Sequence, residues 1–307
     1  MVIVPTAPGG RLDRFLAREA GISRSEAQRW IEAGRVTIDG AVAESSDVVR
    51  AGARVEAEPL DAPRSDLTPD ASVPMEILHV DDALVVLVKP AGIVVHPAPG
   101  AETGTLVHGL LARGYFALPD LDASIRPGIV HRLDKGTSGV MVVARTPEAR
   151  EALKKQFAAH TIEREYVAIC AGIAKTATYR TLHGRDPHYR QKFTSRVKAG
   201  KVAVTHVEYI EPLGPASLVR ATLETGRTHQ IRMHLSEAKT PVIGDALYGK
   251  RIADESLAAI AKELGHQALH ARVLGFVHPT SGASVRFEAA PPPDFQRALD
   301  QLRSKRG

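Results

Sequence analysis

The nine residues from His131 to Gly139, HRLDKGTSG, place one carboxylate where it could do chemistry. Asp134 stands between Arg132 and Lys135, ahead of a turn-forming run of Gly, Thr, Ser and Gly. The apolar run 140–144 follows, so we expect a turn that leads into a buried strand. An Asp in this position can cap the turn, bind a metal, or act beside a cation as an ionised nucleophile or base.

Metal binding has little support in the sequence. His131 has no second histidine at ligand spacing, and His229 and His234 are five residues apart, whereas a helical metal pair is spaced by four. The chain has a single cysteine, Cys170, in the apolar setting VAICAG, so we expect a core thiol and exclude both an internal disulfide and a cysteine-based zinc cluster. No metal site is predicted.

A second group of reactive side chains lies about a hundred residues later, in the segment 223–249, LETGRTHQIRMHLSEAKTPVIGDALYG. Burying its cations without an anionic partner would be costly. We interpret Arg232, between Ile231 and Met233, as part of an alternating strand that points its guanidinium away from both hydrophobic neighbours. It could then meet Asp134 and keep that carboxylate ionised. A surface arginine without a role is the alternative. The cations and histidines packed into this segment are Arg227, His229, Arg232 and His234.

Many strand-like runs follow from residue 74 onward, and helical patterns cover residues 147–160 and 252–264. Neighbouring strands joined by turns predict an α+β domain, residues 74–300, with a mixed, largely antiparallel sheet. The runs are MEILHV, ALVVLVKP, VMVVART, EREYVAICAG, VTHVEYIE, LVRATLE and SVRFEA.

Residues 1–56 have the pattern of a separate small domain. Two short amphipathic helices precede a hairpin whose turn is Asp39-Gly40. The helical half is rich in arginines, including Arg14, Arg24 and Arg29, although the domain as a whole is neutral. Residues 57–73 are rich in Pro, Asp, Ser and Ala and are expected to form a linker.

The net charge of +5 suits a polyanionic partner. The run 185–201 holds six Lys and Arg against one Asp, with two aromatic residues interleaved, which suits contact with RNA; a solvated loop is the alternative. Arg190 and Lys192 are its candidate RNA ligands. No apolar run is long enough for a membrane helix, and residues 1–10 lack the features of a secretion signal, so we expect a cytoplasmic protein without a membrane contact.

The two segments HRLDKGTSG and GRTHQIRMH together resemble the signature of RluA-type pseudouridine synthases. The runs LVKPAGIVVHP, REYVAICAG and ALHARVLGFVHPTSG match further blocks of that family in the same order, so the resemblance spans about residues 75–295. Residues 1–56 resemble the alpha-L RNA-binding module. That module and the segment 201–206 are similar to the RluD branch, which acts on large-subunit ribosomal RNA. Gly136 stands where many relatives have an acid, and we expect it to adjust the turn only.

The resemblance implies a pseudouridine synthase fold and a cofactor-free isomerisation of uridine. It places the catalytic aspartate at Asp134, the active-site tyrosine at Tyr166 and the partner arginine at Arg232. A core tyrosine is the alternative for Tyr166. The target base must leave its stack to reach the site. The residues expected to hold RNA are His131, Arg132, Arg190, Lys192 and Arg227 in the catalytic domain and Arg14, Arg24 and Arg29 in the small domain.

We therefore predict an enzyme that acts as a monomer on RNA, with precursor large-subunit ribosomal RNA as the expected substrate. The same chemistry on tRNA is one alternative. An assembly factor that binds RNA but has lost catalysis is another, although Asp134 and Arg232 are both present. A glycoside hydrolase would need a second acid near Asp134, and the motifs offer an arginine instead.

Overall fold

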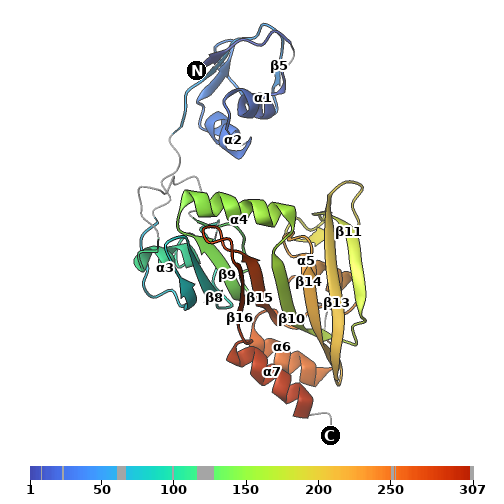
Figure 1. Cartoon of the computed structure of the whole chain (residues 1–307). Helices are drawn as coiled ribbons and strands as arrows, with labels where there is room; N and C mark the ends of the chain where they lie inside the picture. The colour runs from blue at the N-terminus through green and yellow to red at the C-terminus, as the bar shows by residue number, and fades with distance from the viewer. Residues whose placement is uncertain are drawn as a thin grey trace. The chain divides into compact units, whose positions relative to one another are not determined.

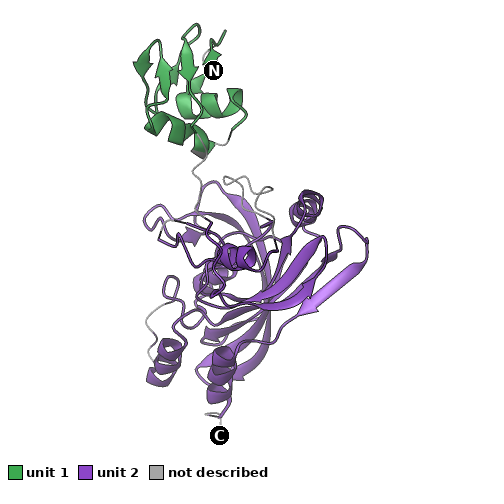
Figure 2. Ribbon diagram, turned by 90° about the vertical axis from the view of Figure 1, so that its left-hand side faces the viewer, with its two compact units in different colours: residues 1–64 green, residues 65–307 purple. Residues whose placement is uncertain are grey.

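The computed structural model describes residues 1–7, 9–22, 24–60, 67–98, 100–115, 128–249, 252 and 254–304. The chain forms two compact units, residues 1–64 and residues 65–307, each with its own packed core (Figure 2). Each unit is described separately below.

The small unit packs two helices, α1 (Leu12–Glu19) and α2 (Arg24–Glu32), against short strands. The hairpin predicted around Asp39-Gly40 is present, and both turn residues have positive φ angles, 52° and 82°. Phe15, Leu16 and Trp30 bury the apolar faces of the helices. The strands are β1 (Val2–Ile3), β2 (Gly10–Arg11), β3 (Val36–Ile38), β4 (Ala41–Val42), β5 (Val48–Val49) and β6 (Val55–Ala57).

The segment predicted as a linker, 57–73, is in part structured. Ala57 is buried in β6, the backbone N–H of Glu58 donates to Arg35 O, and Leu60 packs against the small core. Val73 at the other end is buried in the large unit. The prediction was too broad at both ends because composition does not reveal the backbone pairing and packing at these residues; residues 61–66 lie outside the described part of the chain.

The large unit is built on one ten-stranded sheet in the order β12-β11-β13-β14-β10-β15-β9-β8-β7, with β16 paired to β15 (Figure 1). Among the described strands only β9 and β15 pair in parallel, which confirms the predicted mixed, largely antiparallel α+β fold. The strands are β7 (Glu76–Val80), β8 (Leu84–Lys89), β9 (Ser138–Ala144), β10 (Glu163–Ala171), β11 (Ala177–Arg185), β12 (Phe193–Thr194), β13 (Lys201–Leu213), β14 (Ala216–Leu223), β15 (Leu269–Val277) and β16 (Ser284–Glu288).

Five helices are described in the large unit. α4 (Pro147–Ala159) begins with a Thr146 cap and packs Leu153 on the β8/β9 region of the sheet. α5 (Gln230–Glu237), α6 (Glu255–Leu264) and α7 (Pro293–Ser304) pack on β10, β13 and β14, while α3 (Leu106–Ala112) joins a cluster with Leu133. The cluster of α3 with Leu133 packs apolar side chains against the turn that carries Asp134.

Cys170 lies in β10 with its side chain in the main core, as predicted. Burial raises the pKa of its thiol to about 12. In the described part of the chain no helix has the length and apolar character that spanning a membrane requires.

Candidate active site

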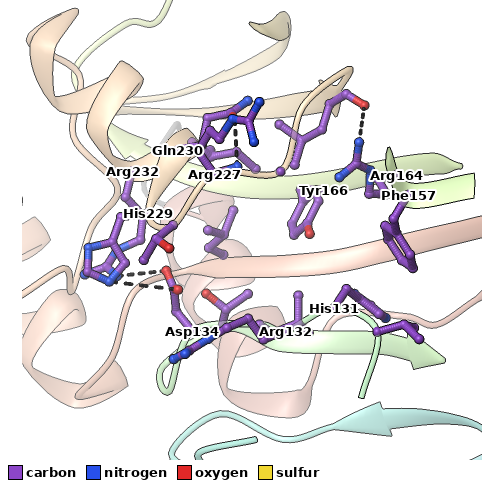
Figure 3. A pocket seen from close by; sticks show the side chains of 18 of the residues that line it. His131, Arg132, Asp134, Phe157, Arg164, Tyr166, Arg227, His229, Gln230 and Arg232 are labelled. Carbon is purple, nitrogen blue, oxygen red and sulfur yellow. Dashed lines mark hydrogen bonds and ion pairs between the residues drawn. The ribbon is translucent and has the colours of Figure 1, made fainter. Parts of the chain in front are cut away.

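A pocket of about 580 Å³ opens between the turn 131–137, strand β10 and the segment that leads into α5 (Figure 3). Its volume is in the range of small-molecule binding sites. Asp134 is the one carboxylate among the described residues that line it, and four arginines share the lining with it. The arginines are Arg132, Arg164, Arg227 and Arg232.

Asp134 and Arg232 meet in this pocket. Arg232 Nη1 donates to Asp134 Oδ2 over 2.9 Å, although the two residues are 98 positions apart. The other side of the guanidinium binds Asp245, from Nε to Oδ2 over 2.7 Å and from Nη2 to Oδ1 over 2.9 Å. The Asp245 side chain is fully buried, whereas 18% of the Asp134 side chain is exposed. Asp245 therefore anchors the arginine, and Asp134 faces the pocket.

Arg232 reaches this position from a helix, so the predicted alternating strand is wrong. Residues 230–237 form α5, and both Ile231 and Met233 are buried on the same short helix as the arginine. Gln230 holds the start of the helix: its amide oxygen accepts from Thr225 Oγ1 and the Arg227 N–H, and its amide nitrogen donates to Val204 O. A buried amide with its hydrogen bonds satisfied fixes the helix start, and hence the approach of the guanidinium.

The turn that carries Asp134 is held from behind by Lys89, the last residue of β8. Its Nζ donates to three carbonyl oxygens, those of Pro90 (2.7 Å), Ile93 (2.9 Å) and Lys135 (3.3 Å). Burial lowers the pKa of Lys89 to about 7, and the nearby Asp134 carboxylate opposes that shift. This contact fixes the backbone beside the candidate catalytic acid.

Gln267 supports the same turn from β15's side of the sheet. Its amide donates to Thr137 Oγ1 over 3.0 Å. A Cβ placed on Gly136 would lie 2.2 Å from Gln267 Oε1, so a larger residue there would displace this side chain. This agrees with the expectation that Gly136 affects the turn.

Tyr166 lies on β10 and projects its ring into the pocket (Figure 3). Burial, with the Asp134 charge, raises the pKa of its phenol to about 12, while the Arg164 guanidinium opposes this shift. The phenol therefore carries its proton at neutral pH. Arg164 itself is buried, and its Nη2 donates to Glu224 O over 2.7 Å.

The sequence profile described as RNA pseudouridylate synthase matches residues 83–237, and the S4 domain profile matches residues 10–55. A "Ribosomal large subunit pseudouridine synthase D" of Pseudomonas aeruginosa is 41% identical, over 99% of this chain and 95% of its own. Its namesake from Xanthomonas campestris is 40% identical, over 98% of this chain and 92% of its own. This chain belongs to the RNA pseudouridylate synthase family.

Solved structures show the same fold. Human RNA Pseudouridylate Synthase Domain Containing 4 superposes with a TM-score of 0.58 at 24% identity, and covers 74% of this chain and 93% of its own. Human RNA Pseudouridylate Synthase Domain Containing 1 gives a TM-score of 0.57, also at 24% identity, with 76% and 89% covered. The sheet described above is therefore the sheet of the pseudouridylate synthase fold.

Three of the predicted RNA ligands line the pocket of this pseudouridylate synthase. Arg132 is exposed at its edge, and Arg227 is half-buried with its Nε donating to Val202 O. His131 is different: its Nε2 accepts the Val142 N–H, its ring stacks on Phe157 at 4.7 Å, and burial lowers its pKa to about 3. Burial therefore favours the neutral imidazole, and the ring forms part of the pocket wall.

The predicted basic run 185–201 forms the end of β11, the strand β12 and the start of β13, which we call the basic hairpin. Arg190 is exposed there. Lys192 is half-buried, with its Nζ 5.5 Å from the Tyr189 ring and 5.8 Å from the Tyr248 ring. Neither residue lines the pocket, nor does Tyr248, although the Tyr248 ring packs beside Arg232.

The three arginines predicted to bind RNA from the small unit differ in their surroundings. Arg14 is exposed. Arg24 donates twice to the buried Asp13 carboxylate, at 2.9 and 2.6 Å, so part of its guanidinium has a structural role. Arg29 is half-buried, and its Nε and Nη2 have no hydrogen-bond partner among the described residues.

Sequence reasoning missed Asp245 and Tyr248 as parts of the synthase site. Both lie in the segment 223–249 that was singled out for its cations, so an acid within reach of Arg232 was available as a signal. Arg164 and Phe157 were missed as pocket residues. In the described ranges no cluster of three or more His, Cys, Asp or Glu is arranged to hold a metal ion.

Proposed function

We propose that this chain isomerises specific uridines of large-subunit ribosomal RNA to pseudouridine, acting in the cytoplasm as a monomer and without a cofactor. Asp134 acts on the sugar, Arg232 holds Asp134 through an ion pair, and Tyr166 holds the base. The observation that carries the proposal is the contact of Arg232 with Asp134 at the wall of an open pocket. The rRNA substrate rests on what the relatives from Pseudomonas aeruginosa and Xanthomonas campestris are named for.

The reaction breaks the bond between N1 of uracil and C1′ of the sugar, turns the base, and joins C5 to C1′. The proton on C5 is lost and N1 gains one, so atoms and electrons balance within the nucleotide. The Asp134 carboxylate either adds to C1′ or removes a proton from the sugar. Both routes need a charged carboxylate, and the Arg232 guanidinium pairs with that carboxylate through a hydrogen bond.

Tyr166 supports the reaction mainly through its ring. A flipped uracil can stack on it. Because the phenol is protonated at neutral pH, it can act as a hydrogen-bond donor from the start, and it can accept the C5 proton only after losing its own proton to another group. Arg132 and Arg227, the two arginines of the pocket lining that are not buried, suit the phosphates on either side of the flipped nucleotide.

The experiment compares wild-type protein with Asp134→Asn on ribosomal RNA, using tritium release from C5 and carbodiimide mapping of the product. We expect RNA binding to persist and isomerisation to disappear in the variant. Asp82→Asn is the matched control, because Asp82 is exposed and outside the pocket lining. Binding without isomerisation by the wild type would favour the assembly factor instead.

The choice between ribosomal RNA and tRNA needs a separate measurement. Pseudouridine maps of both RNA classes from cells with and without this protein should differ in large-subunit ribosomal RNA. A difference confined to tRNA would leave the chemistry intact and overturn the substrate. A glycoside hydrolase has little support, because Asp245, the second acid near Asp134, is buried on the opposite side of Arg232.

A further inference from the structure

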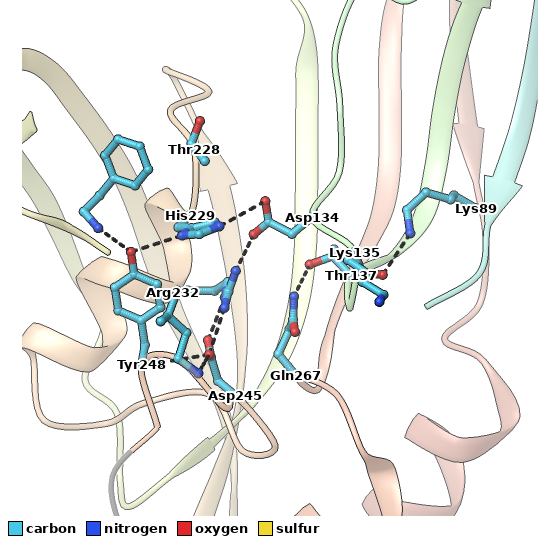
Figure 4. A network of polar contacts seen from close by, with 12 residues as sticks. Lys89, Asp134, Lys135, Thr137, Thr228, His229, Arg232, Asp245, Tyr248 and Gln267 are labelled. Atoms are coloured by element: carbon cyan, nitrogen blue, oxygen red, sulfur yellow. Dashed lines mark hydrogen bonds and ion pairs between the residues drawn. The ribbon is translucent and has the colours of Figure 1, made fainter. Parts of the chain in front are cut away.

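Tyr248 contacts Arg232 and His229, the two side chains that pair with the Asp134 carboxylate, and it also contacts Asp245 (Figure 4). Its backbone N–H donates to Asp245 Oδ1 over 2.9 Å, and its ring lies 5.1 Å from the Arg232 guanidinium carbon. Its phenol oxygen is 3.2 Å from His229 Nδ1 and 2.7 Å from the backbone nitrogen of Phe193. No step of the proposed reaction uses this phenol, although the side chain is buried.

The directions of these hydrogen bonds determine where the proton of His229 sits. The Phe193 N–H can only donate, so the phenol oxygen accepts there. The phenol proton then needs an acceptor, and His229 Nδ1 is the one in contact. In the opposite arrangement the phenol proton would be left without a partner among the described residues, which is costly for a buried group. Nδ1 therefore accepts, and the proton of the neutral imidazole is on Nε2.

That Nε2 atom faces the candidate catalytic acid. It lies 3.9 Å from Asp134 Oδ1, the oxygen that Arg232 does not bind. This separation is ~1 Å longer than a hydrogen bond, and such contacts often shorten when substrate closes a site. His229 also has a left-handed backbone, φ 60°, at the N-cap of α5, a conformation that is uncommon for residues other than glycine.

We propose that Tyr248 and His229 are positioning residues for Asp134. The Tyr248 phenol holds His229 as the Nε2–H tautomer, and the Nε2–H orients Asp134 Oδ1 while Arg232 holds Oδ2. Phe193 is in the basic hairpin, and its N–H donates to the Tyr248 phenol oxygen, which in turn donates to His229 Nδ1. These two hydrogen bonds link a surface suited to RNA with the imidazole that lies beside Asp134. This inference rests on the proposed function.

Tyr248→Phe is the first test, since it keeps the ring over Arg232 and the backbone hydrogen bond to Asp245 and removes only the hydroxyl group. We expect kcat to fall about five- to tenfold, the effect of losing the hydrogen bond that orients His229, with KM for ribosomal RNA nearly unchanged. Tyr209→Phe, on β13 and outside the pocket lining, is the control. An unchanged kcat in Tyr248→Phe would overturn the proposal.

Two substitutions of His229 separate positioning from folding. The Gln side chain can place an amide N–H near the position of Nε2, whereas the shorter Asn side chain places its amide near the position of Nδ1. Asn, however, tolerates the left-handed backbone better than Gln does. We expect His229→Gln to keep the higher kcat and His229→Asn to be the more stable in denaturant unfolding. If activity follows stability and Asn exceeds Gln, the role of His229 is structural only and the proposal is wrong.

The tautomer itself is measurable without any activity. Imidazole ¹⁵N shifts, with His229 assigned by the signal lost in His229→Gln, should show a protonated Nε2 in the wild type and a mixture of tautomers in Tyr248→Phe. A protonated Nδ1 in the wild type would overturn the pair. If the wild type fails to isomerise RNA but shows the Nε2–H tautomer, the proposed function is wrong and the geometry stands.

Discussion

The guanidinium of Arg232 is shared by two carboxylates in unequal surroundings. Asp245 takes two of its nitrogens and also accepts the Leu247 and Tyr248 N–H groups, while Asp134 takes one and faces the pocket. Hydrogen bonds and charge together raise the pKa of Arg232 and lower that of Asp245, against the effect of burial. The position of the Arg232 guanidinium beside Asp134 therefore depends on Asp245, a residue that does not line the pocket.

Asp245→Asn should consequently weaken the hold on Arg232, although Asp245 does not line the pocket. The change leaves the buried guanidinium with one charged partner, and we expect the free energy of unfolding to fall by ~3 kcal/mol. Isomerisation should fall at least about tenfold, equivalent to ~1.4 kcal/mol of transition-state stabilisation. Urea unfolding and tritium release measure the two effects, with the exposed Glu255→Gln as control. Full activity in the variant would show that Asp134 does not need the second carboxylate.

The pairing of Asp134 with Arg232 was predictable from the sequence, but its geometry was not. Charge cost and family resemblance both indicated that the two residues meet. The alternation of Ile231, Arg232 and Met233 fits a strand as well as one turn of a buried helix, and so short a segment cannot distinguish the two. Asp245 was missed because its position depends on the loop after α5 folding back.

Strands β9 and β15 pair in parallel next to the turn that carries Asp134. Gly139 is paired there with Ala271. Its φ is +129°, and a Cβ would lie 2.2 Å from Ala271 O and 2.5 Å from Ala271 N. Because both close atoms are backbone, the two strands would have to separate to admit a side chain.

Gly139→Ala is therefore expected to destabilise the large unit by ~2–3 kcal/mol, through overpacking and an unfavourable backbone angle. Gly136→Ala is the matched comparison three residues away, where the close contact is the flexible end of Gln267 and φ is ordinary. Urea midpoints should fall well below wild type for Gly139→Ala and much less for Gly136→Ala. Equal midpoints would contradict the close strand contact.

Most strands of the large unit were predicted as apolar runs, whereas β11, β12 and β15 were not predicted as strands and α3, α5 and α7 were not predicted as helices. β11 alternates exposed and half-buried residues and carries histidine and arginine, so it lacks an apolar run. α5 buries Gln230 and His234, which have partners on the distant strand β13, and Arg232, whose partners are in the Asp134 turn and the loop after α5. Local hydrophobic pattern cannot reveal elements whose burial depends on such tertiary hydrogen bonds.

Three of the described histidines, spread through the large unit, have pKa values that burial lowers far enough to keep them neutral in the folded protein. Burial lowers the pKa of His131 to about 3, and those of His234 and His270 to about 4. His270 Nε2 donates to Ala289 O, so its Nδ1 accepts from Ser138 Oγ. In the unfolded chain each of these groups binds a proton near pH 6.5.

Stability should therefore decrease as the pH falls. Between about pH 6.5 and about pH 4 the unfolded state binds more protons than the folded state, so the free energy of unfolding drops by up to ~1.4 kcal/mol per pH unit for each histidine. Urea unfolding across this range measures the slope. His270→Gln should reduce it, whereas His188→Gln, at an exposed position, should not. A flat profile would mean that these imidazoles are already charged in the folded protein.

The burial of Cys170 makes the protein suitable for fluorescence labelling. As the single thiol of the chain, with its pKa raised to about 12, it should not react with maleimide dyes while the protein is folded. New cysteines at exposed apolar positions, Val42→Cys in the small unit and Ile173→Cys in the large unit, would then take up the dyes alone. Energy transfer between the two labels would report the separation of the two units with and without RNA.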